Sequence, residues 1–487
     1  MDNIERKLNE ECGVFGIFSQ QTEDVAHLVY YGLYALQHRG QQSCGITVND
    51  DGLFNTYKDA GLVNEVFDAE HLEKLGQGTM AIGHVCYGAA KGNARANSQP
   101  VVVNHIKGRM AIANNGCLVN SHELRNELEM EGAIFHTGSD AELISHIIIK
   151  ERISSPSIEE AVNRAMKRLK GAYSFVVMSP TKIIAARDPH GLKPLCYGIT
   201  SDGSYVFASE SCALDAVGAT LIREMEAGEI IVADKNGIAT NKTHCGTCKK
   251  ALCVFEYVYF ARPDSIMEGC SVHRARRRAG KFLAKEHPVD ADIVIGVPDS
   301  GLDAAIGYSN ESGIPYGIGF LKNKYIGRTF IAPGQKARED LVRIKLNPIS
   351  DTVKGKRVVL IDDSIVRGTT SARIVKLLRD AGAKEVHMRI SSPPFTNPCY
   401  YGTDIDSKDK LIACQHTIDE IATIVGADTL GYLSQESVVK LAGENEHVYC
   451  TACFDGNYPT QIPTADQTNK YDKKLSERTD KKHGGKK

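Results

Sequence analysis

The chain of 487 residues has no tryptophan, a formal net charge of only −2 and no long uninterrupted apolar run. A helix that spans a membrane needs about 20 consecutive apolar residues, so no membrane span is predicted. The first 11 residues, MDNIERKLNEE, also lack the apolar centre of a signal peptide. The balanced charge gives no electrostatic reason to expect a nucleic acid or a membrane surface as partner. These absences predict a cytoplasmic protein.

Cysteine, in contrast, is abundant, with 14 copies in the chain. Without a secretory signal, so many thiols favour metal binding or catalysis over a disulfide framework. The length is sufficient for two or three domains, each with a core of its own, and we expect at least two.

Residues 357–371, RVVLIDDSIVRGTTS, combine three structural signals. Residues 358–361 are a short apolar run typical of a strand buried in a parallel sheet. Asp362 and Asp363 follow at the carboxyl end of that strand, where open α/β sheets bind their ligands. Residues 372–381 have apolar side chains at helical spacing, and Gly382 is placed to end that helix. The segment therefore predicts a strand, a phosphate-binding loop and a helix.

Two carboxylates beside a phosphate site would repel an anion unless they bind hydroxyl groups or a divalent cation. An isolated Asp pair often does no more than cap a turn, but the strand before this pair and the hydroxyl-rich loop after it favour ligand binding. The segment resembles the phosphoribosyl pyrophosphate signature of the type I phosphoribosyltransferases. The resemblance implies that Asp362 and Asp363 bind Mg²⁺ and the ribose hydroxyls. It also implies that the 5-phosphate is held by the following loop, Arg367, Gly368, Thr369, Thr370 and Ser371.

Residues 293–301, IVIGVPDSG, form a second predicted strand and turn. Backbone N–H groups and the Ser300 hydroxyl suit a pyrophosphate there, although an ordinary strand–turn–helix junction has the same pattern. By the same resemblance, Asp299, Ser300 and Gly301 bind the substrate, and Ser300 is a third ligand of the Mg²⁺ ion.

A basic segment that also contains glycine and proline separates these two loops in the sequence. Charged runs are usually solvated faces, but the resemblance makes this one a lid that closes over the diphosphate. We expect Lys322 and Arg328 to stabilise the departing pyrophosphate. The other basic residues of the segment are Lys324, Lys336 and Arg338.

Cys12 begins a short apolar strand, residues 12–18, just after the charged leader. A cysteine near a terminus is more often a small buried residue than a nucleophile. Here it is followed by motifs in a fixed order, LQHRGQ at 36–41, GHV at 83–85, NNG at 114–116, GSD at 138–140, RDP at 187–189 and ASESCAL at 208–214. This series resembles the N-terminal-nucleophile glutaminase domain of the class II amidotransferases, an αββα sandwich of α+β class.

The resemblance implies that residues 1–11 are a propeptide whose removal frees the α-amino group of Cys12. That amine, which titrates near ~8, can then act as the base for the thiol, so no separate histidine base is needed. The same resemblance places the Asn115 amide and the Gly116 N–H in the oxyanion hole. It also implies that Arg39 supports the site and that Asp140 binds the α-ammonium group of glutamine.

Cys86 departs from the family pattern, which has at this position an arginine that holds the glutamine α-carboxylate. A thiol cannot replace a bidentate guanidinium. Either another cation, such as Lys91 or Arg95, reaches the carboxylate, or glutamine binding is weakened or lost. Cys117 is a smaller departure, because the family normally has Asn after the Asn-Gly pair.

Cys450 and Cys453 form a C-x-x-C pair, which alone fits redox, zinc or cluster roles. Together with Cys253 and Cys399 they resemble the four ligands of a [4Fe–4S] cluster in one class of amidotransferases. A four-cysteine zinc site is the alternative, because both metals suit four thiolates. A further pair, Cys245 and Cys248, has no counterpart in that pattern, and a swapped ligand or a labile metal site are both possible.

From Cys12 to about Asp455 the chain resembles the glutamine phosphoribosylpyrophosphate amidotransferases. We therefore expect a propeptide at 1–11, a class II glutaminase domain at 12–240, an α/β type I phosphoribosyltransferase domain with a parallel sheet at 241–460, and a disordered polar tail at 461–487. The resemblance implies that ammonia released from glutamine is transferred to phosphoribosyl pyrophosphate, which gives 5-phosphoribosylamine for purine synthesis. It also implies a homotetramer inhibited by purine nucleotides. Two alternatives stay open, an ammonia-only transferase and a non-enzymatic sensor of phosphoribosyl pyrophosphate or purine nucleotides.

Overall fold

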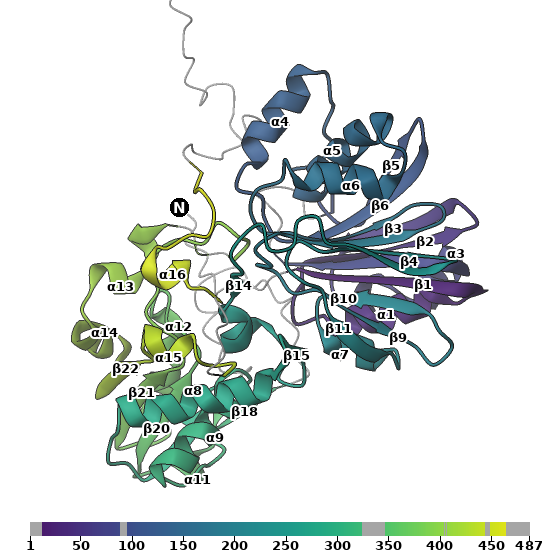
Figure 1. The fold of residues 1–487 in the computed structure, drawn as a ribbon. Helices are drawn as coiled ribbons and strands as arrows, with labels where there is room; N and C mark the ends of the chain where they lie inside the picture. The colour runs from purple at the N-terminus through teal and green to yellow at the C-terminus, as the bar shows by residue number, and fades with distance from the viewer. Residues whose placement is uncertain are drawn as a thin grey trace, which may run out of the picture.

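The computed structural model describes residues 12–87, 95–323, 346–403, 405, 407–443 and 449–463. Figure 1 shows two parts side by side, a larger sheet-rich part made of the first half of the chain and a smaller part made of the second half. The predicted lid residues Lys324, Arg328, Lys336 and Arg338, together with Lys91, the leader 1–11 and the tail from 464, lie outside the described residues.

Two antiparallel sheets form the first part. The seven-stranded sheet has the order β11 (Thr220–Glu224), β9 (Cys196–Ile199), β10 (Tyr205–Ala208), β1 (Gly13–Glu23), β4 (Gly78–Cys86), β2 (Ser43–Asp50) and β3 (Leu53–Ala60). The six-stranded sheet has the order β13 (Gly237–Asn241), β12 (Ile230–Asp234), β8 (Ile183–Arg187), β7 (Ser174–Met178), β6 (Gly108–Asn115) and β5 (Val101–His105).

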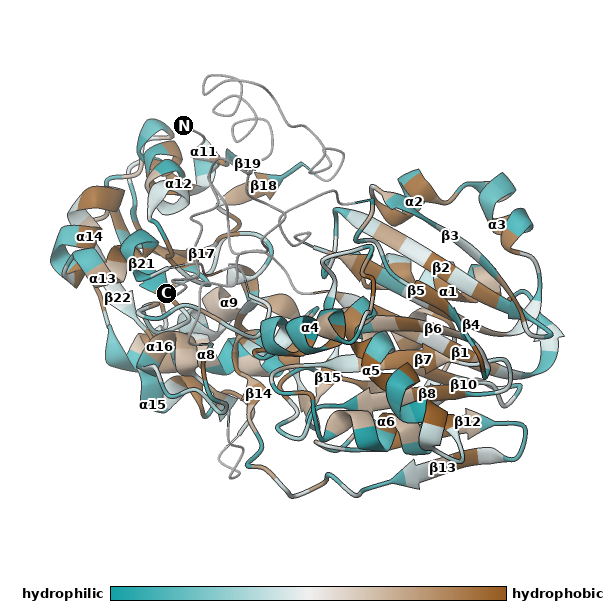
Figure 2. Cartoon of the chain, turned by 90° about the horizontal axis from the view of Figure 1, so that it is seen from above, coloured by the Kyte–Doolittle hydropathy of each residue, from teal (hydrophilic) through white to brown (hydrophobic). Residues whose placement is uncertain are grey.

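The two sheets pack face to face, and helices cover both outer faces. Val14 and Ile82 of the first sheet belong to one buried cluster with Ala113 and Val176 of the second. The outer face of the first sheet packs against α1 (Val25–Ala35), α2 (Val63–Val66), α3 (Ala69–Leu75) and α7 (Ser211–Ala216). The second packs against α4 (Ser121–Met130), α5 (Asp140–Ser154) and α6 (Ile158–Met166). The hydrophobic residues drawn in brown in Figure 2 follow these strands. The predicted αββα sandwich is therefore confirmed.

A four-stranded parallel sheet is the centre of the second part, with the order β17 (Ile293–Gly296), β20 (Arg357–Asp362), β21 (Glu385–Ile390) and β22 (Thr429–Tyr432). One face packs against α8 (Val272–Glu286) and α9 (Gly301–Ser312). The other packs against α12 (Thr369–Asp380) and α14 (Ile418–Val425). This is the α/β domain with a parallel sheet that the sequence predicts. Smaller elements complete it, β18 (Phe320–Lys322), β19 (Leu346–Pro348), α11 (Ser350–Val353), η2 (Lys408–Lys410), α13 (Ile412–Gln415) and α15 (Gln435–Val438).

The apolar run at 358–361 lies inside β20, and the predicted helix at 372–381 corresponds to α12, which begins three residues earlier. Gly382 follows the helix with a φ of +94°, as a C′ glycine does. The predicted strand after Cys12 is β1, which is longer than predicted.

The segment that links the two parts contains β14 (Leu252–Cys253), the π-helix η1 (Glu256–Phe260), β15 (Ile266–Met267) and β16 (Cys270–Ser271). The chain returns to this segment near its end, because β23 (Tyr449–Cys450) pairs in parallel with β14 and places Cys253 beside Cys450. The short helix α16 (Ala452–Asp455) follows. Among the described helices, none combines the length and apolarity that crossing a membrane would require.

Candidate functional site

Cys12 lies half-buried immediately before β1, at the end of the first sheet. Its Sγ is 3.7 Å from the Sγ of Cys86, the last residue of the neighbouring strand β4. The hydrogen bond with Cys86 and the nearby His84 hold the pKa of the Cys12 thiol well below its usual value, although burial opposes this. A lowered pKa increases the fraction of thiolate, and the thiolate is the form that attacks a carbonyl carbon.

Arg39 is buried directly behind this cysteine. Its Nε donates to the Cys12 backbone carbonyl at 3.2 Å. Its terminal N–H groups donate to Glu210 Oε1 at 2.5 Å and to Glu256 Oε1 at 2.6 Å. Burial raises the pKa of Glu210, but His38 and Arg39 outweigh it and hold that pKa well below its usual range. The guanidinium therefore holds the backbone of Cys12 between two buried carboxylates, and the supporting role of Arg39 stays a prediction.

Asn115 ends β6 and is buried, with 1% of its surface exposed. Neither polar atom of its side chain has a hydrogen-bond partner among the described residues. Leaving a buried amide unpaired costs about 1–3 kcal/mol, so such a group is normally reserved for a ligand. Gly116 follows with a φ of +128°, and a Cβ there would lie 2.3 Å from the Ala172 carbonyl oxygen. The pair has the chemistry expected of an oxyanion hole.

Asp140 begins α5, and its Oδ2 accepts a hydrogen bond from the Leu118 N–H at 2.8 Å. Burial raises the pKa of this carboxyl to about 6, while the hydrogen bond from Leu118 opposes the shift. A carboxylate that is poorly solvated in this way would be stabilised by an ammonium group, which is the predicted ligand of Asp140.

Cys86 occupies the position at which the family pattern has an arginine. No described neighbour directly supplies the positive charge of that arginine. Arg95, one of the two predicted substitutes, is 70% exposed and lies 3.2 Å from Asp59 Oδ2 through its Nη2. Burial of the sulfur and the nearby charges of Asp140 and Cys12 raise the pKa of Cys117, the second departure. The glutamine carboxylate ligand is therefore not identified among the described residues.

The two predicted substrate loops meet at the carboxyl ends of β17 and β20. The Ser300 hydroxyl donates to Asp363 Oδ2 at 2.5 Å. The Asp363 N–H donates to Asp362 Oδ1 at 3.0 Å. A Cβ on Gly301 would lie 2.4 Å from the Ile361 carbonyl oxygen, so only glycine permits this approach. Ser300 and Asp363, which are 63 positions apart in the sequence, thus lie together, and the hydroxyl oxygen of one contacts a carboxylate oxygen of the other.

A basic side chain, Lys322, and the N-terminus of helix α12 belong to the same predicted substrate site. The Lys322 ammonium forms an ion pair with Asp299, which is exposed at the turn after β17. Gly368 caps the N-terminus of α12 with a φ of +80°, and Ser371 in its first turn is buried. Thr369, Thr370 and Ser371, which were predicted as part of the loop, instead form the first turn of α12 after Arg367 and Gly368. The N-terminus of a helix is suited to bind a phosphate.

Buried contacts connect the two sites. Glu256, the partner of Arg39, begins η1 and lies three residues after Cys253. The guanidinium of Arg276, on α8, donates to the η1 carbonyls of Tyr257 and Tyr259, each at 2.9 Å. Helices α8 and α9 then touch backbone to backbone, since a Cβ on Gly307 would lie 1.9 Å from a carbonyl oxygen of α8. Helix α9 begins next to Ser300. The packed elements η1, α8 and α9 therefore connect the surroundings of Cys12 with the second site.

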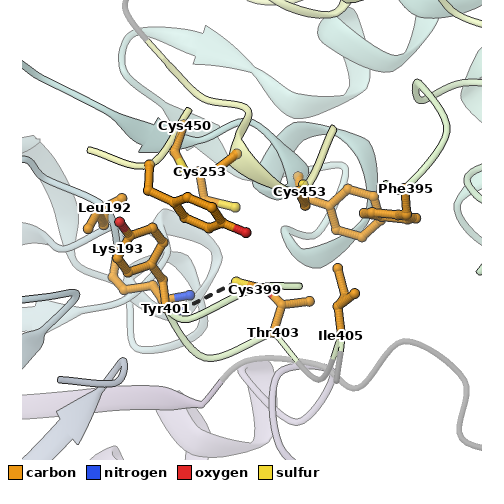
Figure 3. Close-up of a pocket in the computed structure, with 13 residues that line it drawn as sticks. Leu192, Lys193, Cys253, Phe395, Cys399, Tyr401, Thr403, Ile405, Cys450 and Cys453 are labelled. Atoms are coloured by element: carbon orange, nitrogen blue, oxygen red, sulfur yellow. Dashed lines mark hydrogen bonds between the residues drawn. The ribbon is translucent and has the colours of Figure 1, made fainter. Parts of the chain in front are cut away.

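A pocket between the linking segment, the loop after β21 and the C-terminal segment contains all four predicted cluster cysteines. Figure 3 shows Cys253, Cys399, Cys450 and Cys453 around it, from two strands, a loop and the short helix α16. Its remaining lining residues are Leu192, Lys193, Phe255, Phe395, Tyr401, Thr403, Ile405, Ala452 and Tyr458. The Tyr401 N–H donates to Cys399 Sγ at 3.4 Å, drawn as a dashed line in Figure 3.

Two thiols of this pocket, Cys450 and Cys453, have raised pKa values. Burial raises the pKa of Cys450 to about 12, with a partly opposing effect of Lys193. Burial, followed by the charges of Cys253, Cys399 and Cys450, raises the pKa of Cys453 well above its usual value. Within the described ranges, no three His, Cys, Asp or Glu side chains are close enough to hold one metal ion.

No role was predicted for Glu210, Glu256 or Arg276, which hold Cys12 and the linking segment in place. Glu210 lies in the motif at 208–214, but Arg39 is 171 residues away from Glu210 and 217 residues away from Glu256. His84 also lies in a quoted motif without a role, and its Nε2 donates to the Asn114 carbonyl at 3.0 Å. The motifs in the sequence could have drawn attention to Glu210 and His84. Their contacts with other residues could be identified only from the folded structure.

Comparison with known proteins agrees with both halves of the geometry. Residues 90–216 match the family model of a glutamine amidotransferase domain, and residues 272–428 match that of a phosphoribosyl transferase domain. The chain is 49% identical to the amidophosphoribosyltransferase of Methanocaldococcus jannaschii over 93% of this chain and 98% of that protein. It is 47% identical to the amidophosphoribosyltransferase of Bacillus subtilis over 93% of this chain and 95% of that protein.

Two solved structures share the whole fold. The allosteric regulatory enzyme of purine biosynthesis matches with a TM-score of 0.87 at 47% identity, over 93% of this chain and 97% of that one. The glutamine phosphoribosylpyrophosphate amidotransferase from Bacillus subtilis, complexed with ADP and GMP, matches with a TM-score of 0.86 at 47% identity. It covers 93% of this chain and 98% of that one.

Proposed function

The chain belongs to the amidophosphoribosyltransferase family, and we propose that its two sites divide the reaction between them, with Cys12 as the glutaminase nucleophile. As a glutamine amidotransferase and pentosyltransferase, the enzyme uses glutamine and phosphoribosyl pyrophosphate at the first step of purine synthesis. The observation that supports this division best is that the first part contains a thiol of lowered pKa and a buried Asn115 amide with no hydrogen-bond partner among the described residues, whereas the second part contains the Ser300–Asp363 contact.

At the first site, the Cys12 thiolate attacks the side-chain amide carbon of glutamine. The Asn115 amide and the Gly116 N–H stabilise the negative oxygen that develops, and Arg39 keeps the Cys12 backbone in place. Loss of ammonia leaves a thioester, and water then releases glutamate. Asp140 binds the α-ammonium group of glutamine. Ammonia reaches the second site inside the protein.

At the second site, ammonia attacks C1 of the ribose and pyrophosphate leaves, which gives 5-phosphoribosylamine. Asp299, Ser300 and Gly301 hold the pyrophosphate, Asp362 and Asp363 the ribose, and the loop from Arg367 to Ser371 the 5-phosphate. Lys322 and Arg328 stabilise the leaving group. Catalysis here consists mainly of positioning and charge stabilisation, because the leaving group carries most of the developing charge.

A magnesium ion fits this second site. Ser300, Asp362 and Asp363 offer hydroxyl and carboxylate oxygens that converge on one point, and Mg²⁺ prefers such oxygen ligands together with substrate phosphates. When bound, the ion would neutralise the pyrophosphate charge. The carboxylates themselves position the ribose and keep the Ser300 hydroxyl oriented.

The cysteine pocket brings together four thiols, the donor set that a [4Fe–4S] cluster or a zinc ion takes, and we propose the cluster. A cluster binds each thiolate through a different iron and needs wider spacing between its sulfurs than one zinc ion does. Cys253, Cys399, Cys450 and Cys453 would hold it, and it would tie the C-terminal segment to the linking segment. Cys245 and Cys248 stay without an assigned role.

Further features of the family extend the proposal. The Bacillus subtilis relative was solved with ADP and GMP, which supports purine nucleotides as feedback inhibitors here. We assign residues 1–11 to a propeptide, 12–240 to the glutaminase domain, 241–460 to the phosphoribosyltransferase domain and 461–487 to a polar tail, in a cytoplasmic homotetramer. The identity across both halves favours the full reaction over the ammonia-only and sensor alternatives.

The test is to separate the two half-reactions by mutation. Cys12→Ala should lower glutamine-dependent phosphoribosylamine formation at least ~10³-fold, because it removes the nucleophile. Formation from ammonium salts should stay within about twofold of the unmodified enzyme, since the second site is intact. Asp363→Asn should instead weaken synthesis from both donors. If Cys12→Ala still used glutamine, the proposed division of labour would be wrong.

A further inference from the structure

Cys12 and Cys86 form a pair of thiols that the glutaminase reaction does not require. In the ladder between β1 and β4, Gly13 lies opposite Val85 and Val14 lies opposite His84. Extending this antiparallel register by one residue places Cys12 directly opposite Cys86. Their Sγ atoms are 3.7 Å apart.

This arrangement matches the backbone geometry of a disulfide. Residues directly opposite in an antiparallel pair have Cα atoms about 4.5–5.5 Å apart. Disulfides bridge Cα atoms that are about 4.4–6.8 Å apart, with an S–S bond of about 2.05 Å. The two sulfurs therefore need to move together by less than about 2 Å, and side-chain rotation can supply that movement without shifting the strands.

The two sulfurs also differ in chemical character, as an attacking thiol and a resolving thiol must. Hydrogen bonding and the nearby His84 favour the thiolate of Cys12, whereas the same hydrogen bond and burial raise the pKa of Cys86. Cys12 is half-buried at a site that must admit glutamine, so a peroxide can reach it. Cys86 is 9% exposed and faces the Cys12 sulfur.

We propose that Cys12 and Cys86 are a reversible thiol-oxidation site, at which a peroxide converts the pair to a disulfide and stops glutamine hydrolysis. The Cys12 thiolate attacks H₂O₂ and becomes a sulfenic acid, with loss of hydroxide. The Cys86 thiol then attacks the sulfenic sulfur, and the S–S bond forms as water leaves. The pair loses two electrons and two protons, the peroxide becomes two waters, and a dithiol reverses the step. The proposal rests on Cys12 as the proposed nucleophile.

The neighbouring thiols make the partner choice testable. Cys44 lies opposite Val85 in the ladder between β2 and β4, is fully buried and has a raised pKa because of that burial. Cys117 is an exposed thiol near enough to interact with Cys12 electrostatically. Cys117→Ser is therefore the matched control for Cys86→Ser, because each variant removes one thiol whose own pKa is raised by the charge of Cys12.

The experiment treats the full mature enzyme, purified without oxygen, with graded H₂O₂. It follows glutamine hydrolysis, ammonia-dependent synthesis and iron content. We expect hydrolysis to fall at least ~10-fold and to recover with dithiothreitol, while ammonia-dependent synthesis stays within about twofold. Non-reducing tryptic mapping should show peptide 12–39 joined to peptide 75–91. Cys117→Ser should behave like the unmodified enzyme.

Cys86→Ser should instead lose the reversible phase. Without a resolving thiol, Cys12 should proceed to the sulfinic acid, and dithiothreitol should not restore hydrolysis. The proposal is overturned if the joined peptides are absent while hydrolysis is lost, or if Cys12 pairs with Cys117. An untreated enzyme that does not hydrolyse glutamine would instead refute the proposed nucleophile, and the peptide map would still decide the disulfide separately.

Discussion

Asn115 shows how a single buried side chain can indicate a reaction. Its amide has no partner among the described residues, and it lies one residue before a glycine that no larger residue could replace. Asn115→Ala should lower kcat for glutamine hydrolysis by ~10²–10³-fold with little change in KM, because the donor acts on the developing oxyanion. Steady-state kinetics would measure this, with exposed Asn236→Ala as control. A change in KM alone would contradict the role.

Asp140 predicts a dependence on pH. Burial raises its pKa to about 6, so the carboxylate form dominates above that pH and the neutral form below it. Only the carboxylate attracts the glutamine ammonium group. KM for glutamine should therefore rise about tenfold per pH unit below pH 6, while KM for phosphoribosyl pyrophosphate should not. Asp140→Asn should raise KM for glutamine at pH 8 and abolish this dependence. A persistent rise in that variant would assign it to another group.

The sequence located these residues but not their surroundings. Asn115, Gly116 and Asp140 lie in short motifs whose residue types state their chemistry. Cys12 and Cys86 are 74 residues apart, and their contact depends on the register of β1 and β4. The ion pairs of Arg39 depend on Glu210 and Glu256, which are still further away in the sequence. Local sequence does not determine such long-range register, so the Cys86 departure could be noticed but its contact with Cys12 could not be foreseen.

Among the structural elements, the strand–loop–helix units were the most predictable. An apolar run followed by Asp362 and Asp363 and then by a helix with a C′ glycine defines β20 and α12 within a few residues. The meeting of Ser300 with Asp363 follows from the rule that parallel strands direct their carboxyl ends to one edge. The π-helix η1 was not predicted, because π-helices are rare and no sequence pattern marks them.

The pairing of β14 with β23 gives a prediction for the metal site. It holds Cys253 beside Cys450, while Cys399 comes from the loop after β21 and Cys453 from α16. Elemental analysis of protein purified without oxygen should find about four iron atoms and four sulfides per chain. Cys450→Ser should reduce both strongly, while Cys248→Ser, at an exposed cysteine outside the pocket, should not. Zinc in place of iron in the unmodified protein would contradict the cluster.

At the scale of the whole molecule, the arrangement joins two reactions that need each other. Arg39, which contacts the Cys12 carbonyl, pairs with Glu256 of the linking segment. Arg276 of α8 donates to carbonyls of η1, and α8 packs against α9, which begins beside Ser300. Packed elements of this kind transmit strain because cores have few voids. The same contacts place the cysteine pocket beside the linking segment, between the two halves of the chain.

Cys86 makes the choice of nitrogen donor the central question for this molecule. The most direct measurement is 5-phosphoribosylamine formation from phosphoribosyl pyrophosphate with glutamine or with ammonium salts as donor, using protein purified without oxygen. The account predicts that glutamine supports synthesis and that Cys12→Ala abolishes only that reaction. Synthesis from ammonium salts alone would contradict it, and the first half of the chain would then be a scaffold for an ammonia-dependent transferase.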